Sequence, residues 1–406
     1  MLTIQLCFKS LRVDTDIDDI NMDLQTTSDW AAQWRVTFNA SKSECMLVSK
    51  KIVRPAKLPV NFNGTEIKYV SSHCHLGIWL TESMSWDKQI IEINKKSAKS
   101  INLLKRLSYV LDRKTKLFLY KSYIRPLLEY NTCLYDGNLT KGQSDALEAT
   151  QRQALLCATN AYRHTSHERL LLETGIEPLN IRRKYFSLCH LYRIINGLTP
   201  TYLADILPPY VGDSFRYPLR NAHNFLIPKT RKNYVRLSFF WRVIEIWNSM
   251  SLCVRESPSL ASYKVALKAM FFYKHSKFFD LHTPKASVHH ARMRMGLSAL
   301  NAHRKKFNFI DFNHCPYCGQ KPEDPVHFFL KCPYHAIHRT RLVGTIHPIT
   351  ITKIPNLIIN PASRTDFSAF TNLLLFGSEL LSFDENIAMF KAVHEYIYRT
   401  KRFEMG

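Results

Sequence analysis

The sequence predicts an α+β protein that is mostly α-helical, with a small antiparallel sheet near its start and a zinc-binding domain near its end. Three observations favour this class. Short runs rich in β-branched and aromatic residues fill residues 35–80, helical periodicity begins after residue 85, and three cysteines lie near a histidine late in the chain. With 46% hydrophobic residues and 12 glycines in 406 residues, a disordered or fibrous chain is excluded.

The first predicted helix covers residues 18–34, because its apolar residues recur at helical spacing behind an acidic first turn. A small antiparallel sheet follows, and Asn63-Gly64 supplies the turn of a hairpin within it. Its five expected strands are residues 35–39, 45–48, 60–62, 66–70 and 76–80.

From Ser85 onward, the apolar residues follow a helical period. One face of this helix carries Ile90, Ile93, Ser97, Ile101, Leu104 and Leu107, and most of its lysines fall elsewhere. Further helices are expected over residues 113–123, ending before Pro126, and over 145–160 with Ser144 as the N-cap. Later helices are expected over residues 181–196, 238–250 and 384–401.

The chain is strongly basic, with 56 Lys and Arg against 33 Asp and Glu and a formal charge of +23. The charge concentrates in residues 88–125 and 281–345, and either stretch alone is equally well explained as a solvated helix face. Two such stretches favour a phosphate backbone, so RNA or DNA is the expected partner. The candidate contacts are Lys95, Lys96, Lys99, Arg292, Arg294, Arg304, Lys305 and Lys306.

The strongest chemical signal is Cys315-Pro-Tyr-Cys318, followed by His327 and Cys332. Three thiolates and one imidazole satisfy tetrahedral Zn²⁺, and four protein ligands leave no position for a catalytic water, so the expected zinc is structural. Two alternatives stay open. The cysteines are buried thiols without metal, or His314 or His335 replaces His327 as the fourth ligand.

No apolar run is long enough to span a bilayer, no secretory signal is evident, and seven cysteines lack disulfide-like spacing. These features predict an intracellular protein, cytoplasmic or nuclear, without a membrane partner or an evident small-molecule substrate.

Several motifs follow one another along the chain: Leu24-Gln25 with Trp30, Trp34, Phe38-Asn39 and Lys42, then His75-Leu-Gly-Ile-Trp-Leu80, Tyr120-Lys-Ser-Tyr-Ile-Arg-Pro126, Arg292-Met-Arg-Met-Gly-Leu297 and the Cys-Cys-His-Cys group. Taken in order, they resemble the C-terminal part of the reverse transcriptase of non-LTR, LINE-type retrotransposons of the jockey-like kind. The position of His75 departs from the pattern, because the family usually has an aromatic residue there.

The resemblance implies five regions: a palm remnant (1–84), a helical thumb (85–165), a proline-punctuated helical connection (166–285), the CCHC zinc-knuckle region (286–345) and a helical C-terminal segment (346–406). The family's aromatic-x-Asp-Asp motif, which binds catalytic Mg²⁺, is expected at or before Met1. Asp18-Asp19 is interpreted as a helix cap, the tryptophans as core residues, and Lys42 as an exposed lysine.

The leading hypothesis is therefore a nucleic-acid-binding remnant of an RNA-directed DNA polymerase, truncated at its N-terminus and inactive as this chain. In the first alternative the chain is a fragment of an active polymerase, and Mg²⁺ would be a cofactor only with that active site restored. In the second alternative it is a zinc-dependent protein-interaction module.

Overall fold

The computed structural model describes most of the chain, and the fold is mostly helical with a few short strands, as predicted. The described residues are 10, 16–36, 38, 43–51, 53, 55–214, 221–227, 229–231, 233–272, 279, 284–320, 322–351, 353–354 and 364–404. They form two compact units, Met1–Ile93 and Asn94–Gly406, so the division lies within one helix, nine residues after the predicted boundary at residue 84.

The first unit begins with helix α1 (Asp16–Gln33), and Asp18 and Asp19 lie in its first turn. Ile17 and Ala31 are buried, and Ile20 and Leu24 pack on a small cluster of Val60, Phe62 and Ile67. Trp30, in the last turn of α1, and Trp34, just after its end, are 48% and 65% exposed, so the expectation that these two tryptophans lie in the core is wrong.

The short strands form three two-stranded sheets instead of one antiparallel sheet. Strands β1 (Glu44–Cys45) and β4 (Lys68–Tyr69) are parallel, whereas β2 (Asn61–Phe62) pairs with β3 (Thr65–Glu66) and β5 (Ser72–His75) with β6 (Ile78–Thr81) antiparallel. Asn63 and Gly64 have φ of 53° and 73°, so the predicted hairpin turn is confirmed. The strand expected over residues 35–39 is not formed at Arg35 and Val36, while Asn39 and Lys42 lie outside the described residues.

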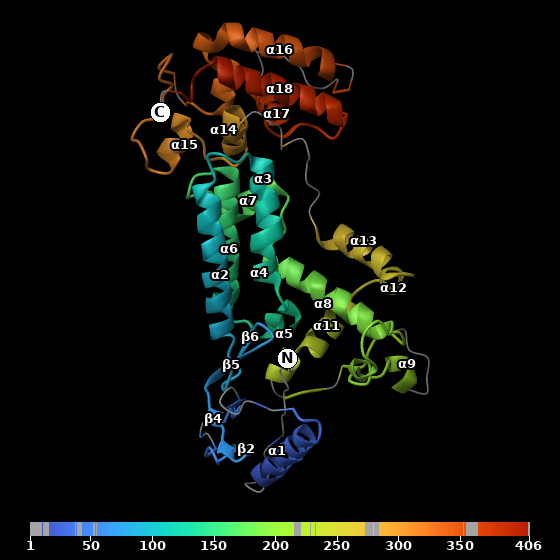
Figure 1. The fold of residues 1–406 in the computed structure, drawn as a ribbon. Coiled ribbons are helices and arrows are strands. Elements are labelled where there is room, and N and C mark those ends of the chain that lie inside the picture. The colour runs from blue at the N-terminus through green and yellow to red at the C-terminus, as the bar shows by residue number, and fades with distance from the viewer. Residues whose placement is uncertain are drawn as a thin grey trace. The chain divides into compact units, whose positions relative to one another are not determined.

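The helical bundle of the second unit contains the part of α2 (Asp87–Arg106) from Asn94 onward. Its other members are α3 (Arg113–Leu119), the π-helical turn η2 (Tyr120–Ile124), α4 (Arg125–Glu129), α5 (Thr132–Tyr135) and α6 (Lys141–Thr159). Helices α2, α3 and α6 run side by side (Figure 1). Five of the six predicted core positions on α2 are buried, and Leu107, just after its end, is 38% exposed.

Two predicted helix boundaries in this bundle are wrong. Pro126 does not stop the helix, because it lies in the first turn of α4, where a missing N–H costs nothing, after a wider π turn. Helix α6 begins earlier than expected because Thr140, not Ser144, is the N-cap, with Gln143 completing a capping box.

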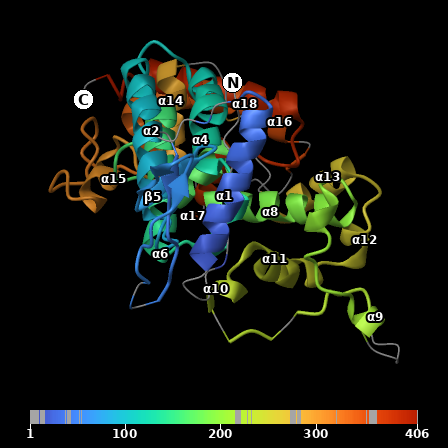
Figure 2. The same ribbon diagram turned by 60° about the horizontal axis from the view of Figure 1, so that its bottom comes forward.

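A second apolar cluster joins α8 (Leu179–Ile195), α11 (Phe239–Asn248) and α13 (Leu260–Phe271), which lie together in both views (Figures 1 and 2). Trp247 is buried in it as expected, Trp241 is half-buried, and Trp86 of the first unit is also buried. Helix α7 (His167–Thr174) packs against α6 instead. The other short helices are α9 (Val211–Ser214), α10 (Asn233–Arg236) and α12 (Leu252–Arg255).

The C-terminal part has one apolar cluster shared by α14 (Pro284–Arg294), the π-helical turn η6 (His327–Lys331), α16 (Ala336–Thr350), α17 (Arg364–Phe376) and α18 (Phe383–Arg399). Helix α15 (Asn301–Lys306) precedes the cysteine segment. Because α16 runs through residue 345 and the core continues on both sides, residues 286–345 share their core with residues 364–404. None of the described helices is both long and apolar enough to cross a membrane.

Candidate metal centre and basic surfaces

The structure brings together the four residues expected to bind metal. One donor atom each of Cys315, Cys318, His327 and Cys332 lies within 4.8 Å of all the others. Cys318 Sγ lies 3.4 Å from His327 Nε2, and Cys315 Sγ lies 3.8 Å from Cys332 Sγ. Three sulfurs and one imidazole nitrogen that converge in this way can hold a tetrahedral metal ion.

A tight turn places the first two sulfurs. The Gly319 N–H donates to the Cys315 carbonyl at 2.9 Å, and the Cys315 N–H donates to the Gln320 carbonyl at 2.9 Å. Gly319 has a φ of 72°, which a residue with a Cβ adopts only with strain. The sequence Cys-x-x-Cys-Gly therefore encodes the turn that directs both thiols to one point.

A π-helical turn places the other two ligands. The Cys332 N–H donates to the His327 carbonyl at 2.8 Å, five residues back, so the two ligands lie one wide turn apart. The Asp324 carboxylate accepts from the His327 N–H at 2.7 Å and fixes the start of this turn. The adjoining side chains of Phe328 and Phe329 are buried in the C-terminal core.

The alternative histidine ligands lie elsewhere. The His314 ring packs on Phe312 at 4.6 Å, and His335 is buried against Phe328 and Tyr317. Burial lowers the pKa of His335 to about 4. Among the described residues, the metal-binding group contains His327 and neither of these two.

Without a cation, Cys315 and Cys332 are held in the protonated form. Burial raises the pKa of Cys315, and burial together with the neighbouring Cys315 raises the pKa of Cys332 to about 12. Burial also lowers the pKa of His327, so the imidazole is neutral and can act as a ligand. A bound cation reverses the preference of the thiols, because the thiolate is the ligand form.

A buried ion pair ties the metal-binding segment to the end of the chain. Glu323 is 1% exposed, and its carboxylate accepts from Arg402 Nη2 at 2.7 Å and from the Asn301 N–H at 2.8 Å. The Tyr396 hydroxyl of α18 donates to the Phe328 carbonyl at 2.5 Å. The sequence does not predict this contribution of the C-terminus, because nothing in its pattern pairs Glu323 with a residue 79 positions away.

The predicted nucleic-acid contacts separate into surface and internal groups. Lys95, Lys96 and Lys99 are exposed on α2, Lys305 and Lys306 are exposed at the end of α15, and Arg304 is half-buried. The five lysines lie at the surface, where a phosphate backbone in solution can reach them.

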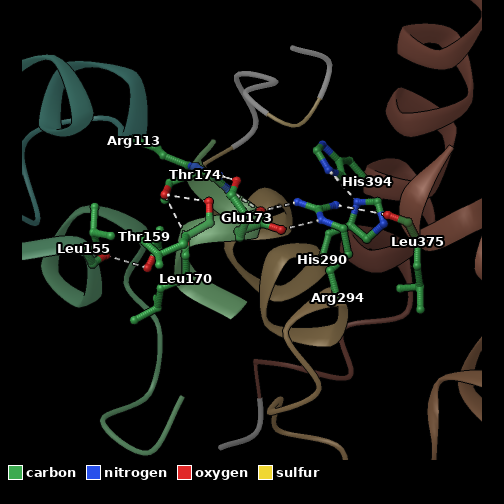
Figure 3. Close-up of polar contacts among 11 residues, drawn as sticks. Arg113, Leu155, Thr159, Leu170, Glu173, Thr174, His290, Arg294, Leu375 and His394 are labelled. Carbon is green, nitrogen blue, oxygen red and sulfur yellow. Dashed lines mark hydrogen bonds and ion pairs between the residues drawn. The ribbon is translucent and has the colours of Figure 1, made fainter. Parts of the chain in front are cut away.

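Arg292 and Arg294 instead have partners inside the protein. Arg294 is 9% exposed and donates to both Glu173 oxygens at 2.9 and 2.8 Å (Figure 3). Arg292 donates to the Asn160 carbonyl at 2.7 Å and lies over the Tyr162 ring. We therefore assign both arginines to internal packing, because their guanidinium groups already satisfy carboxylate, carbonyl and aromatic partners.

Glu173 is the centre of this internal network and was not predicted. Arg113 of α3 donates to Glu173 Oε1 at 2.6 Å and to its carbonyl at 2.7 Å (Figure 3). Burial alone raises the pKa of Glu173, but the charges of Arg294 and Arg113 outweigh it and hold the pKa below its ordinary value. The network joins α3, α7 and α14, which belong to three of the regions predicted from the sequence.

The fold and site therefore define a basic, mostly helical protein with a Cys3His metal-binding group. Comparison with curated proteins then gives two relatives, both retrovirus-related Pol polyproteins. One, from type-1 retrotransposable element R1 of Bradysia coprophila, is 26% identical over 181 residues, which is 44% of this chain and 18% of the relative. The other, from element R1 2 of Nasonia vitripennis, is 23% identical over 328 residues, which is 79% of this chain and 73% of the relative.

No family model matches the chain, and no solved structure matches it. The two relatives confirm the resemblance seen in the motifs: the protein is related to the Pol polyproteins of non-LTR retrotransposons.

Proposed function

We propose that this protein is a nucleic-acid-binding part of a retrotransposon Pol polyprotein, held together at its C-terminal end by one structural zinc ion. The single observation that carries the proposal is the convergence of Cys315, Cys318, His327 and Cys332 beside an exposed basic helix end. The relationship to Pol polyproteins supports RNA or DNA as the partner.

Zinc is the metal that the donor set favours. Soft thiolate ligands select Zn²⁺, Cu(I) or iron–sulfur clusters, and a mixed set of three sulfurs and one imidazole in tetrahedral arrangement is typical of structural zinc. The ion would join the turn at Cys315 to the π-helical turn at His327, and so fix the backbone on both sides of Glu323.

The proposal concerns binding, not polymerisation. Asp18 and Asp19 lie at the first turn of α1, where acidic side chains stabilise the helix N-terminus, and this placement supports the helix-cap interpretation. The five-region division of the chain likewise remains a proposal, with a helical thumb formed by the bundle and a zinc region that shares its core with the C-terminal helices.

The test is the salt dependence of RNA binding. A protein that neutralises phosphates releases counterions, so the logarithm of the affinity should fall linearly with the logarithm of the salt concentration. The double variant Lys96→Glu, Lys99→Glu should bind more weakly, with a slope smaller by about one for each phosphate that is no longer neutralised.

The matched control is Lys264→Glu, Lys268→Glu, which reverses two exposed lysines on α13 and changes the net charge equally. This control should retain most of the affinity and the original slope. Equal reductions in both variants would mean that only net charge matters, and affinity without any salt dependence would exclude phosphate binding altogether.

A further inference from the structure

A loop of exposed aromatic residues lies between α15 and the first metal ligand. Residues 307–314, Phe-Asn-Phe-Ile-Asp-Phe-Asn-His, are called the aromatic loop below. Phe309 is 48% exposed and Phe312 is 45% exposed. Two half-exposed aromatic side chains on one short loop form a candidate contact surface, because covering them with a ligand removes apolar area from water.

The rings of this loop pair with one another and with the bundle. The Phe307 and Phe309 ring centroids are 6.4 Å apart with planes 25° from parallel, and the His164 ring lies 5.6 Å from Phe309. Phe312 lies 4.6 Å from His314 at 31°. Each exposed ring thus has an aromatic neighbour, and about half of Phe309 and of Phe312 remains open to solvent.

The backbone under these rings is held by hydrogen bonds. The Phe309 N–H donates to the Arg304 carbonyl and the Asn308 N–H to the Lys305 carbonyl, both at 2.9 Å. At the other end, the Asn301 side chain donates to the His314 carbonyl at 2.8 Å, and the Glu323 N–H donates to the Asn313 carbonyl at 2.7 Å. The rings are thus supported on a fixed scaffold, which reduces the entropy lost when they bind a ligand.

The surroundings of the loop are basic. Lys305 and Lys306 are exposed directly before it, and Arg163 is exposed next to His164, which contacts Phe309. Asp311 is the one acidic residue between positions 301 and 314. Positive charge beside exposed aromatic rings favours an anionic ligand that itself carries aromatic rings.

We propose that the aromatic loop binds single-stranded nucleic acid, with bases stacked on Phe309 and Phe312 and phosphates held by Lys305, Lys306 and Arg163. This inference rests on the proposed function and specifies that the bound nucleic acid is single-stranded. A single strand fits because its bases are free to stack on protein rings, whereas the base faces within a duplex are already covered by their neighbours.

The experiment compares binding of a 12-nucleotide oligouridine and of an RNA duplex of the same length. The double variant Phe309→Leu, Phe312→Leu keeps apolar side chains but removes the rings. Its affinity for the single strand should fall by about tenfold or more, because each base that stacks on an aromatic ring contributes substantially to the free energy of binding. Its salt slope should be unchanged, since no charge is altered, and duplex binding should change little.

Two further variants separate stacking from packing. Phe309→Tyr, Phe312→Tyr keeps both rings and should retain the affinity for the single strand. The matched control, Tyr202→Leu, Tyr398→Leu, removes two rings that are 63% and 69% exposed elsewhere and should bind as the unaltered protein does. Circular dichroism and zinc content of each variant establish that it is folded.

Unchanged single-strand affinity in the leucine variant would overturn this inference, as would an equal reduction for single strand and duplex. If the leucine variant instead alters only self-association, the loop is a protein contact and the inference is also wrong. These failures differ from failure of the proposed function, in which the unaltered protein itself binds neither RNA probe.

Discussion

The helical bundle and the metal-binding segment are stabilised in different ways. In the bundle, α2, α3 and α6 each bury apolar side chains: Ile101, Leu117, Leu147 and Leu155 are each at most 5% exposed. Among the described residues from 311 to 326, by contrast, only Cys315 and Glu323 are buried, and neither is an ordinary apolar residue.

This difference shows how one chain uses two sources of stability. The bundle gains from the hydrophobic effect and needs no ligand. The loops around Cys315 gain from ligand chemistry and from the ion pair between Glu323 and Arg402, because they have too little apolar surface to bury. This difference predicts that metal removal destabilises the metal-binding segment and leaves the helical bundle folded.

The largest expected effect is that of Cys332→Ser on metal binding. Even changes to residues that only support a ligand cost about 10–100-fold in metal affinity, so removal of a ligand should cost about 100-fold or more. Chelator competition measures the affinity, and limited proteolysis should show new cleavage near residues 311–326. Cys253→Ser is the control, because Cys253 is exposed and remote from the ligand group. Similar zinc affinity in both variants would contradict the assignment.

The second effect concerns the ion network that joins α3 of the bundle to α7 and α14. Glu173→Gln leaves Arg113 and Arg294 without a counterion in a buried position and should lower the free energy of unfolding by about 3–5 kcal/mol. Urea denaturation at neutral pH measures it. Glu395→Gln, in an exposed pair with Arg399, should cost at most about 1 kcal/mol. A comparably small cost at Glu173 would show that the network is not buried in solution.

The third effect is a dependence on pH that arises from His290 and His394. The two rings hydrogen-bond at 3.2 Å between His290 Nδ1 and His394 Nε2 (Figure 3). The His290 Nε2–H donates to the Leu374 carbonyl. Burial, and then the charge of Arg294, lowers the pKa of His394 to about 3 and that of His290 well below its ordinary value. The unfolded chain therefore binds more protons than the folded protein below about pH 6.5.

Stability should accordingly fall as the pH drops from 6.5 toward 4, by up to about 1.4 kcal/mol per pH unit for each histidine. His394→Gln should reduce this slope by roughly one proton, measured as urea midpoints at several pH values. Acid also releases zinc, but equally from both proteins, so the difference between the slopes isolates the histidine. His223→Gln, at an exposed position, should leave the slope unchanged, and a slope unaffected by His394→Gln would contradict the buried pair.

Local patterns in the sequence predicted much of this structure. The helical period predicted α1, α2, α8, α11 and α18, and the spacing of Cys315, Cys318, His327 and Cys332 predicted the metal-binding group, because ligands within 18 residues are constrained by the chain itself. The hairpin at Asn63 followed from turn chemistry in the same way.

Interactions between distant residues were not predictable. Nothing in the sequence distinguishes Arg294 from an exposed arginine. Only the fold brings it to Glu173, 121 positions earlier. Trp30 is exposed whereas the adjacent Ala31 is buried, and an aromatic residue alone does not reveal its side of a helix. The parallel pairing of β1 with β4 likewise depends on contacts that no local pattern contains.

The central claim, that a metal ion holds the Cys3His segment while the bundle stands by itself, is tested most directly by hydrogen exchange of the zinc-loaded and zinc-free protein. We predict that removing zinc speeds exchange at the Gly319 and Cys332 amides, which are hydrogen-bonded within the segment, and leaves α6 and α8 protected. Unchanged exchange at Gly319 and Cys332, or equal acceleration throughout α6 and α8, would contradict the claim.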